Sequence, residues 1–242
     1  MRSAIGTAAG GIVGFGILRM VYPAFEYEAM GELPIEPTVE QMRQFTQAHR
    51  DYYMMNNAVG LAVIGASIAI AFACVTARRK RIASAALAGI LGGVVGAVAG
   101  YFTGLPIADA MVLSKDQSLV QASLLHFSFW GGLGLCMAAA VGGIQGGART
   151  MAQAAVAGLL GGILSVVLYT IVASVVFPAA NLIHTLPETA GHQALWVLVS
   201  SLVLGAAIGK LAEPPTSKQE VQEGSQSPEE MSSELQNDGT EK

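Results

Sequence analysis

Long apolar blocks separated by short polar segments dominate this chain of 242 residues. A helix needs about 20 apolar residues to cross the roughly 30 Å of hydrocarbon in a bilayer. The blocks have about that length, contain no Asp or Glu, and lack the alternation of barrel strands, so each predicts a membrane-spanning helix. We expect an all-α integral membrane protein with about six transmembrane helices, at residues 4–21, 57–77, 82–102, 119–141, 151–177 and 194–211.

The first block has two interpretations. Arg2 precedes it, as a basic residue precedes the apolar region of a signal peptide. However, it lacks a clear small-residue cleavage site, and it shares the paired glycines Gly10 and Gly11 with later blocks. We therefore assign it to a helix of the mature protein.

An internal repeat groups the blocks into helical hairpins. Residues 83–95 (ASAALAGILGGVV) and 152–164 (AQAAVAGLLGGIL) are identical at eight of thirteen positions, and the first block has the same Gly-Gly-aliphatic-aliphatic core. Because each unit holds two spans, successive copies insert in the same orientation, which predicts parallel repeats around an axis along the membrane normal. The three hairpins cover about residues 1–77, 82–141 and 151–211.

Small residues recur at every fourth position along several blocks. Such a stripe lets two helix backbones approach closely, which favours helix packing within a membrane. The alternative is that the stripes line a narrow pore, but we favour close packing because such stripes are common in inert bundles. The glycines predicted to pack helices are Gly10, Gly14, Gly92, Gly96, Gly100, Gly161, Gly162, Gly205 and Gly209.

Composition and charge agree with a membrane environment and predict an orientation. Hydrophobic residues make up 52% of the chain and charged residues 12%, against about a quarter charged in ordinary soluble domains. The positive-inside rule assigns the side rich in Lys and Arg to the cytoplasm, which predicts a multi-pass cell (inner) membrane protein with both termini cytoplasmic. Residues 212–242, rich in Glu, Ser and Gln, are predicted to form a disordered acidic tail. The basic residues of the cytoplasmic side are Arg2, residues 78–81, Arg149 and Lys210.

The loop at about residues 22–56 is predicted to contain an amphipathic helix. Thr38 followed by Gln41 is typical of a helix N-terminus with a capping box. From about Val39, the positions of Val39, Met42 and Phe45 share one helix face. We expect this helix either to lie on the outer surface or to continue directly into the second span. Its apolar face is expected on the bundle or on lipid headgroups, and partner binding is the alternative.

Three histidines occupy comparable places in the predicted hairpins. His49, His126 and His192 each lie at or shortly before the second helix of a hairpin, or in its first turns. If the three positions converge, neutral imidazoles would suit zinc, nickel, cobalt or copper. The other interpretation, which we favour because their offsets from the helix starts are unequal, is that they are interfacial side chains. The sequence predicts no bound cofactor.

The sequence leaves two functions open. It contains no HExxH, GxSxG, P-loop or CxxC motif, so we predict that the protein is not an enzyme and does not bind nucleic acid. The first function is a non-enzymatic membrane component with tightly packed helices, in contact with the lipid bilayer and with identical copies or other membrane subunits. The alternative is a channel or carrier for a small solute or metal ion along the axis between the repeats.

Overall fold

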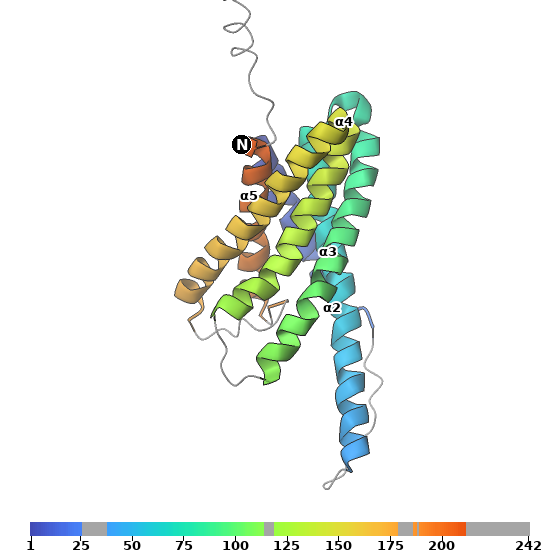
Figure 1. The fold of residues 1–242 in the computed structure, drawn as a ribbon, viewed down its shortest axis with the longest axis vertical. Coiled ribbons are helices and arrows are strands. Elements are labelled where there is room, and N and C mark those ends of the chain that lie inside the picture. The colour runs from blue at the N-terminus through green and yellow to red at the C-terminus, as the bar shows by residue number, and fades with distance from the viewer. Residues whose placement is uncertain (26–37, 114–118, 179–185, 188, 212–242) are drawn as a thin grey trace, which may run out of the picture. The chain divides into compact units, whose positions relative to one another are not determined.

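The computed structural model describes residues 1–25, 38–113, 119–178, 186, 187 and 189–211. This part of the chain is all-helical and contains no strand (Figure 1). By length and composition, five of its helices are able to cross a membrane, consistent with a helical membrane protein. The predicted tail, residues 212–242, lies outside the described residues. The helices are α1 (Arg2–Val21), α2 (Val39–Thr76), α3 (Ile82–Leu113), α4 (Leu119–Val176) and α5 (Ala190–Leu211), with a short 3-10 helix, η1 (Arg79–Arg81), before α3.

Helix α4 is two antiparallel arms joined at a glycine. It has 58 residues, but Gly147 has non-helical dihedral angles, φ 76° and ψ −161°, which only glycine adopts readily. On either side of this kink the arms, residues 119–146 and 148–176, fold back on one another. A Cβ built at Gly142 would lie 2.8 Å from the Ala154 Cβ, and the backbones of Gly134 and Gly158 are in contact farther along. The arms correspond to the separate helices predicted at residues 119–141 and 151–177.

The helices close into a ring. Each helix packs against the next in the chain, and α5 packs back against α1. Small residues at these seams let the backbones lie close together. For example, a Cβ at Gly65 on α2 would come 2.7 Å from the Gly93 carbonyl oxygen on α3. At the closing seam, a Cβ at Gly205 on α5 would lie 2.7 Å from the Ser3 carbonyl oxygen on α1. The chain therefore runs around the ring and returns to its first helix.

Seven of the ten basic residues that the structure describes gather at one end of this ring, and Arg19, Arg43 and Arg50 lie toward the other. The start of α1, the end of α2, the start of α3, the Gly147 kink and the end of α5 all lie there, as the contacts of Gly6 with Val75 and of Gly209 with Ser3 require. At this end the Arg81 guanidinium donates hydrogen bonds to the carbonyl oxygens of Ile144 (2.7 Å) and Gln145 (3.0 Å). We call this the basic end, and the other the opposite end.

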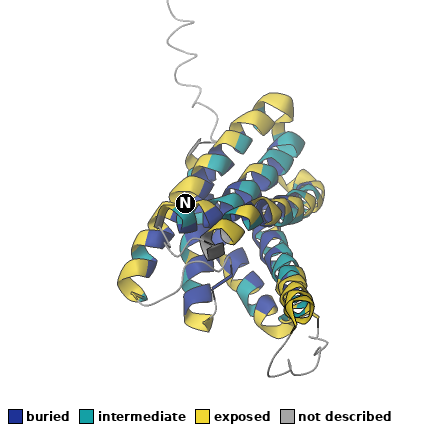
Figure 2. Ribbon diagram, turned by 60° about the horizontal axis from the view of Figure 1, so that its bottom comes forward, coloured by how far each residue is buried: buried dark blue, intermediate teal, exposed yellow. Residues whose placement is uncertain are grey.

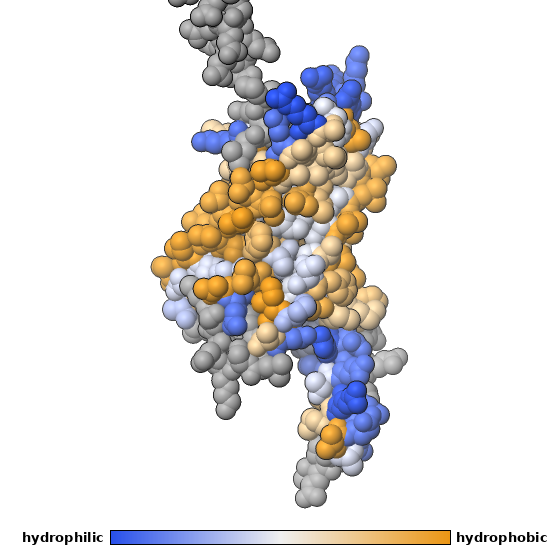
Figure 3. Space-filling model, in the orientation of Figure 1, coloured by the Kyte–Doolittle hydropathy of each residue, from blue (hydrophilic) through white to orange (hydrophobic). Residues whose placement is uncertain are grey.

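A continuous apolar core fills the ring. Its buried side chains come from all five helices, and the largest are aromatic: Trp130, Trp196, Tyr169 and Phe129. Buried residues lie on the helix sides that face one another, and exposed residues face outward (Figure 2). Many exposed side chains are apolar, and they form a hydrophobic belt between polar regions at the two ends (Figure 3). An apolar belt of this kind is suited to the hydrocarbon of a bilayer.

Helix α2 confirms the predicted capping box and excludes one of the expected positions of its apolar face. Its N-cap is Thr38, and the Thr38 and Gln41 side chains form the reciprocal hydrogen bonds of a capping box. The predicted amphipathic helix continues without a break into the second span, giving one helix of 38 residues. Its apolar face does not pack on the bundle, however, since Val39 is 88% exposed and Met42 46% exposed. The physical reason is length, because the helix carries these residues beyond the ends of its neighbours (Figure 1).

Candidate functional site

The surplus length of α2, residues 39–56, projects at the opposite end of the ring. We call this segment the arm, and it is distinct from the two arms of α4. A helix needs about 20 residues to cross a bilayer, so α2, with 38, has about 18 to spare. At a rise of 1.5 Å per residue, the arm extends roughly 27 Å. Most of its side chains are exposed, and burial begins only at its base.

Asn56 fixes the base of the arm. Its side chain is fully buried, and its Nδ2 donates to the carbonyl oxygens of Phe25 (3.3 Å) and Tyr52 (3.0 Å). The Phe25 N–H donates in turn to the Asn56 Oδ1 at 2.9 Å. Next to it, the Tyr22 hydroxyl donates to the Asn57 Oδ1 at 3.1 Å. Burial, followed by the nearby Tyr52, raises the pKa of Tyr22, so this hydroxyl stays protonated at neutral pH. The segment after α1 is thereby tied to α2.

An ion pair supports the arm farther out. The Arg50 guanidinium lies 2.8 Å from the Asp109 carboxylate near the end of α3. Both side chains are about half exposed, so the pair contributes little to stability by itself. Its effect is geometric, because it links the arm to a second helix one and a half turns beyond Asn56. The arm therefore leaves the ring in a defined direction.

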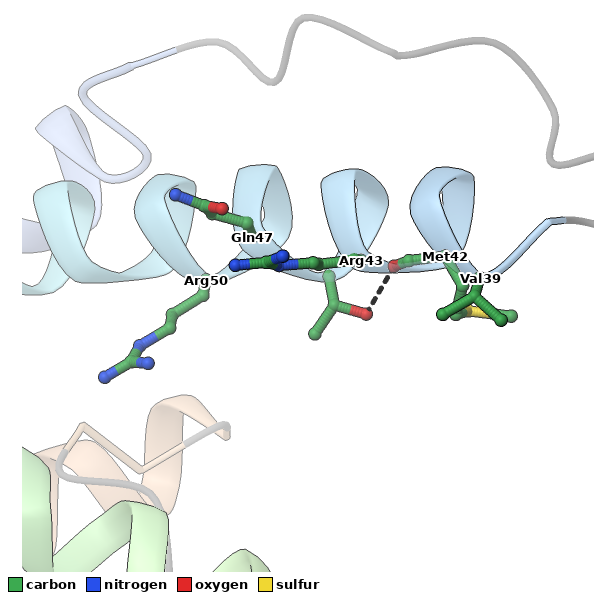
Figure 4. A pocket seen from close by; sticks show the side chains of 6 residues that line it. Val39, Met42, Arg43, Gln47 and Arg50 are labelled. Atoms are coloured by element: carbon green, nitrogen blue, oxygen red, sulfur yellow. Dashed lines mark hydrogen bonds between the residues drawn. The ribbon is translucent and has the colours of Figure 1, made fainter.

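A hollow of about 720 Å³ lies along one face of the arm (Figure 4). Val39 and Met42 give its outer part an apolar wall, and Arg43 adds a guanidinium. Nearer the ring, Gln47 and Arg50 line it, with Arg50 reaching to Asp109. The hollow thus combines apolar contact with a cationic group. These are features suited to a protein segment that carries apolar and acidic side chains.

A second candidate site is buried within the ring. The Tyr169 hydroxyl and His192 Nε2 share a hydrogen bond of 2.6 Å between α4 and α5. The His126 ring packs edge-on against Tyr169, with ring centroids 5.2 Å apart. His126 and His192 are 1% and 3% exposed, although both residues are polar. An ionisable group buried at membrane depth is a general pointer to function.

Several polar atoms beside this cluster are buried without a partner among the described residues. They are the indole nitrogens of Trp130 and Trp196, the Gln193 Oε1 and the Ser200 hydroxyl. The two indole rings are in contact, with centroids 5.1 Å apart. Leaving such a group unsatisfied costs about 1–3 kcal/mol, so these atoms are sites at which a hydrogen-bonding partner would be favourable.

The three histidines predicted as metal ligands do not come together. His126 and His192 both contact Tyr169, but His49 lies on the arm, where its ring stacks on Phe45 and packs edge-on against Tyr53. Among the described residues, no group of three His, Cys, Asp or Glu side chains is placed to hold a metal ion. The reason lies in α2, which carries His49 out along the arm and away from the ring.

The nine glycines predicted to pack helices all face another helix. A Cβ built at any of them would meet a neighbouring helix at 3.1 Å or less. Those of α1 face α2, and those of α3 face the first arm of α4. Gly161 faces α5 and Gly162 faces the first arm of α4, whereas Gly205 and Gly209 face α1.

Two residues of these sites escaped the sequence analysis. Asn56 stands next to the expected start of a span, where polar residues are common and give no signal. Its role depends on a hydrogen bond with Phe25, 31 positions away in the sequence. Tyr169 had a signal, because in the repeat it aligns with Gly100 and interrupts the small-residue stripe of its hairpin. A bulky polar residue in a close-packing position indicates a local change in the seam.

No protein-family model matches this chain, and no curated protein or solved structure matches it either.

Proposed function

We propose that the chain is a non-enzymatic membrane component that uses the arm of α2 to assemble with another protein in or at the membrane. The observation that carries the proposal is the arm itself, a helix held in a defined direction at its base, on whose apolar and cationic face Val39 and Met42 are exposed and no other described helix packs. Exposed apolar groups on a water-facing helix are unfavourable unless something covers them. The partner is a second copy of this chain or another membrane subunit.

The membrane part of the proposal is a bundle of six crossings built from three hairpins. The paired glycines support it. In each pair the first glycine contacts the second helix of its own hairpin: Gly10 meets Ser67, Gly92 meets Cys136, and Gly161 meets Leu204.

The second glycine of each pair contacts the preceding hairpin. Gly93 meets Gly65, Gly162 meets Gly131, and Gly11 meets Ser201 of the last helix. Equivalent residues thus make equivalent contacts, as three units around one axis would. The alternation of helix directions around the ring also supports six crossings.

The arm is tested by a photo-crosslinking residue at Met42, on the open face, in cells or native membranes. We expect a protein adduct, identified by mass spectrometry as a second copy or a membrane subunit. The matched control is Gln44, which is exposed on the other side of the same helix turn. Equal adducts at both positions, or lipid adducts alone at Met42, would contradict the proposal.

The orientation is tested separately with an impermeant thiol reagent. In a background lacking Cys74 and Cys136, a cysteine at Gln47 on the arm is expected to react in intact cells, and one at Arg79 only after permeabilisation. Reaction of Arg79→Cys alone in intact cells would reverse the proposed sidedness. The basic end would then face outward.

A second function, a carrier for a small polar solute, is favoured by one observation. Polar atoms around Trp130 and Trp196 that have no partner among the described residues lie beside the His126, Tyr169 and His192 side chains. A solute or water file at this place would satisfy them. Hydroxyl-radical labelling distinguishes the two functions, since a carrier exposes Trp196 to water and a sealed bundle does not.

A further inference from the structure

A groove separates the two arms of α4 on the side of the ring that faces outward. The arms cross in close contact where a Cβ at Gly162 would lie 2.6 Å from the Gly131 Cα. Beyond this crossing, on the side away from Gly147, they leave a groove of about 410 Å³. The apolar side chains that line it are Val120, Leu124 and Phe127 on one arm and Ile163, Val166 and Val167 on the other.

The groove opens onto the apolar belt. Val120 is 68% exposed and Val167 50% exposed, and both form its rim. Farther along the second arm, Ile171 and Val175 are also exposed and apolar. Ser123 is the single polar side chain among the residues that line the groove. The groove is therefore a recess in a hydrocarbon-facing surface.

Phe127 is the one aromatic residue among those that line the groove in the described part of the chain. A Cβ at Gly131 would lie 2.8 Å from the Phe127 Cε2, so the ring lies over this glycine at the crossing point. Phe127 therefore lines the groove where the two arms are in close contact.

We propose that this groove binds one acyl chain of a membrane phospholipid. Water is unsuited to it, because a bound water needs two to four polar partners, and among the described residues that line the groove the only polar side chain is Ser123. An acyl chain is apolar, flexible and abundant at this depth. It gains contacts on both walls that a flat helix surface does not offer, and dispersion is the main source of affinity where lipid replaces lipid. The inference rests on the membrane placement proposed above.

Native mass spectrometry tests the site on the full chain. The protein is reconstituted in vesicles of phosphatidylethanolamine and phosphatidylglycerol, extracted in mild detergent, and stripped of surface lipid by increasing collision energy. We expect the parent to retain one phospholipid per chain after the other lipids have left. Val167→Trp fills the groove from its rim and is expected to reduce the retained fraction at least fivefold. Recovery of the protein in the membrane fraction before extraction checks the membrane placement independently.

Leu168→Trp is the matched control. Leu168 is 43% exposed and adjacent to Val167, but it does not line the groove. This variant is expected to retain lipid as the parent does. The proposal is overturned if the parent retains no phospholipid or only detergent, or if both variants retain it equally. Should Val167→Trp not fold, Val167→Phe replaces it, with the same criterion.

Discussion

At the residue scale, the buried Asn56 side chain shows how one amide group determines the path of two segments. It forms hydrogen bonds with the N–H and the carbonyl oxygen of Phe25 and with the carbonyl oxygen of Tyr52. No apolar residue of similar size meets all three groups. When a partner is removed, a buried backbone group left without a hydrogen bond costs about 1–3 kcal/mol.

We therefore expect Asn56→Ala to destabilise the protein by about 1–3 kcal/mol, because it leaves the Phe25 backbone groups without their partner. The readout is the thermal unfolding midpoint in detergent. Asn57→Ala is the control, since Asn57 is half-buried and its described partners are the side chains of Tyr22 and Tyr101 and not backbone groups. An equal loss in both variants would show that Asn56 has no special role.

Glycine provides a second residue-scale test because positions of the same residue type differ in surroundings. A Cβ at Gly96 would collide with the Gly132 carbonyl oxygen, whereas Gly16 has nothing within 4 Å. We expect Gly96→Ala to lower stability by about 1–3 kcal/mol through overpacking. Gly16→Ala is expected to leave it unchanged or raise it by up to about 1 kcal/mol, since alanine favours the helix.

Differential scanning fluorimetry of the two variants measures this contrast. Gly96→Ala matching the parent would place the α3 seam in loose surroundings and remove the close-packing interpretation. Val95→Leu supplies a further control, because Val95 is 58% exposed on the neighbouring outward face.

At the scale of elements, local signals were predictable and long-range ones were not. The start of α2 followed from Thr38 and Gln41, whose capping interactions span three residues. The straight continuation of the arm into the second span was one of two expectations, because a helix start says nothing about where the helix ends. The path of α3 to Leu113, through Pro106, also exceeded the apolar block that predicted it.

The kink in α4 was outside the reach of the apolar pattern. The sequence indicated a break between residues 141 and 151, but it did not show that helical dihedrals resume on both sides of Gly147. Several small residues there, including Gly142 and Gly146, allow the arms to fold back with their backbones close together. Which glycine adopts the positive φ depends on the packing of both arms.

Gly147→Ala is expected to destabilise the hairpin by about 1–3 kcal/mol, because a side chain disfavours φ 76° with ψ −161°. No atom lies within 4 Å of the position where its Cβ would be, so the effect is strain and not collision. Chemical or thermal unfolding in detergent measures it. If Gly147→Ala were as stable as Gly16→Ala, the backbone at residue 147 would have to adopt another conformation.

At the scale of the whole molecule, the closure of the ring could not be predicted from the sequence. The hairpin repeat suggested three similar units, but the contact between α5 and α1 joins segments about 200 residues apart. The histidines show the same limit, since similar positions in the chain placed His126 and His192 near Tyr169 and His49 on the arm. Placement in space depended on helix lengths, which the apolar blocks gave only roughly.

Ring closure is testable with a disulfide. A Cβ at Gly209 would lie 3.2 Å from the Ser3 Cβ, near the 3.5–4.5 Å of a disulfide. In a background lacking Cys74 and Cys136, Ser3→Cys with Gly209→Cys is expected to cross-link on mild oxidation, as detected by peptide mass spectrometry. A cysteine pair at Ser3 and Gly104, at opposite ends of the ring, is the control that is expected to stay reduced. Failure of the first pair to cross-link would contradict the contact between α1 and α5 that closes the ring.

The unbroken backbone of α2 has a mechanical consequence. Its inner half packs against α1 and α3, and its outer half extends as a continuous helix of roughly 27 Å. If the axis of the packed half tilts by about 10°, the tip of the arm moves by about 5 Å, which is close to the length of one helical turn. Any tilt of the packed half would therefore reach the exposed Val39 and Met42 at the tip as a several-fold larger displacement than at the base of the arm.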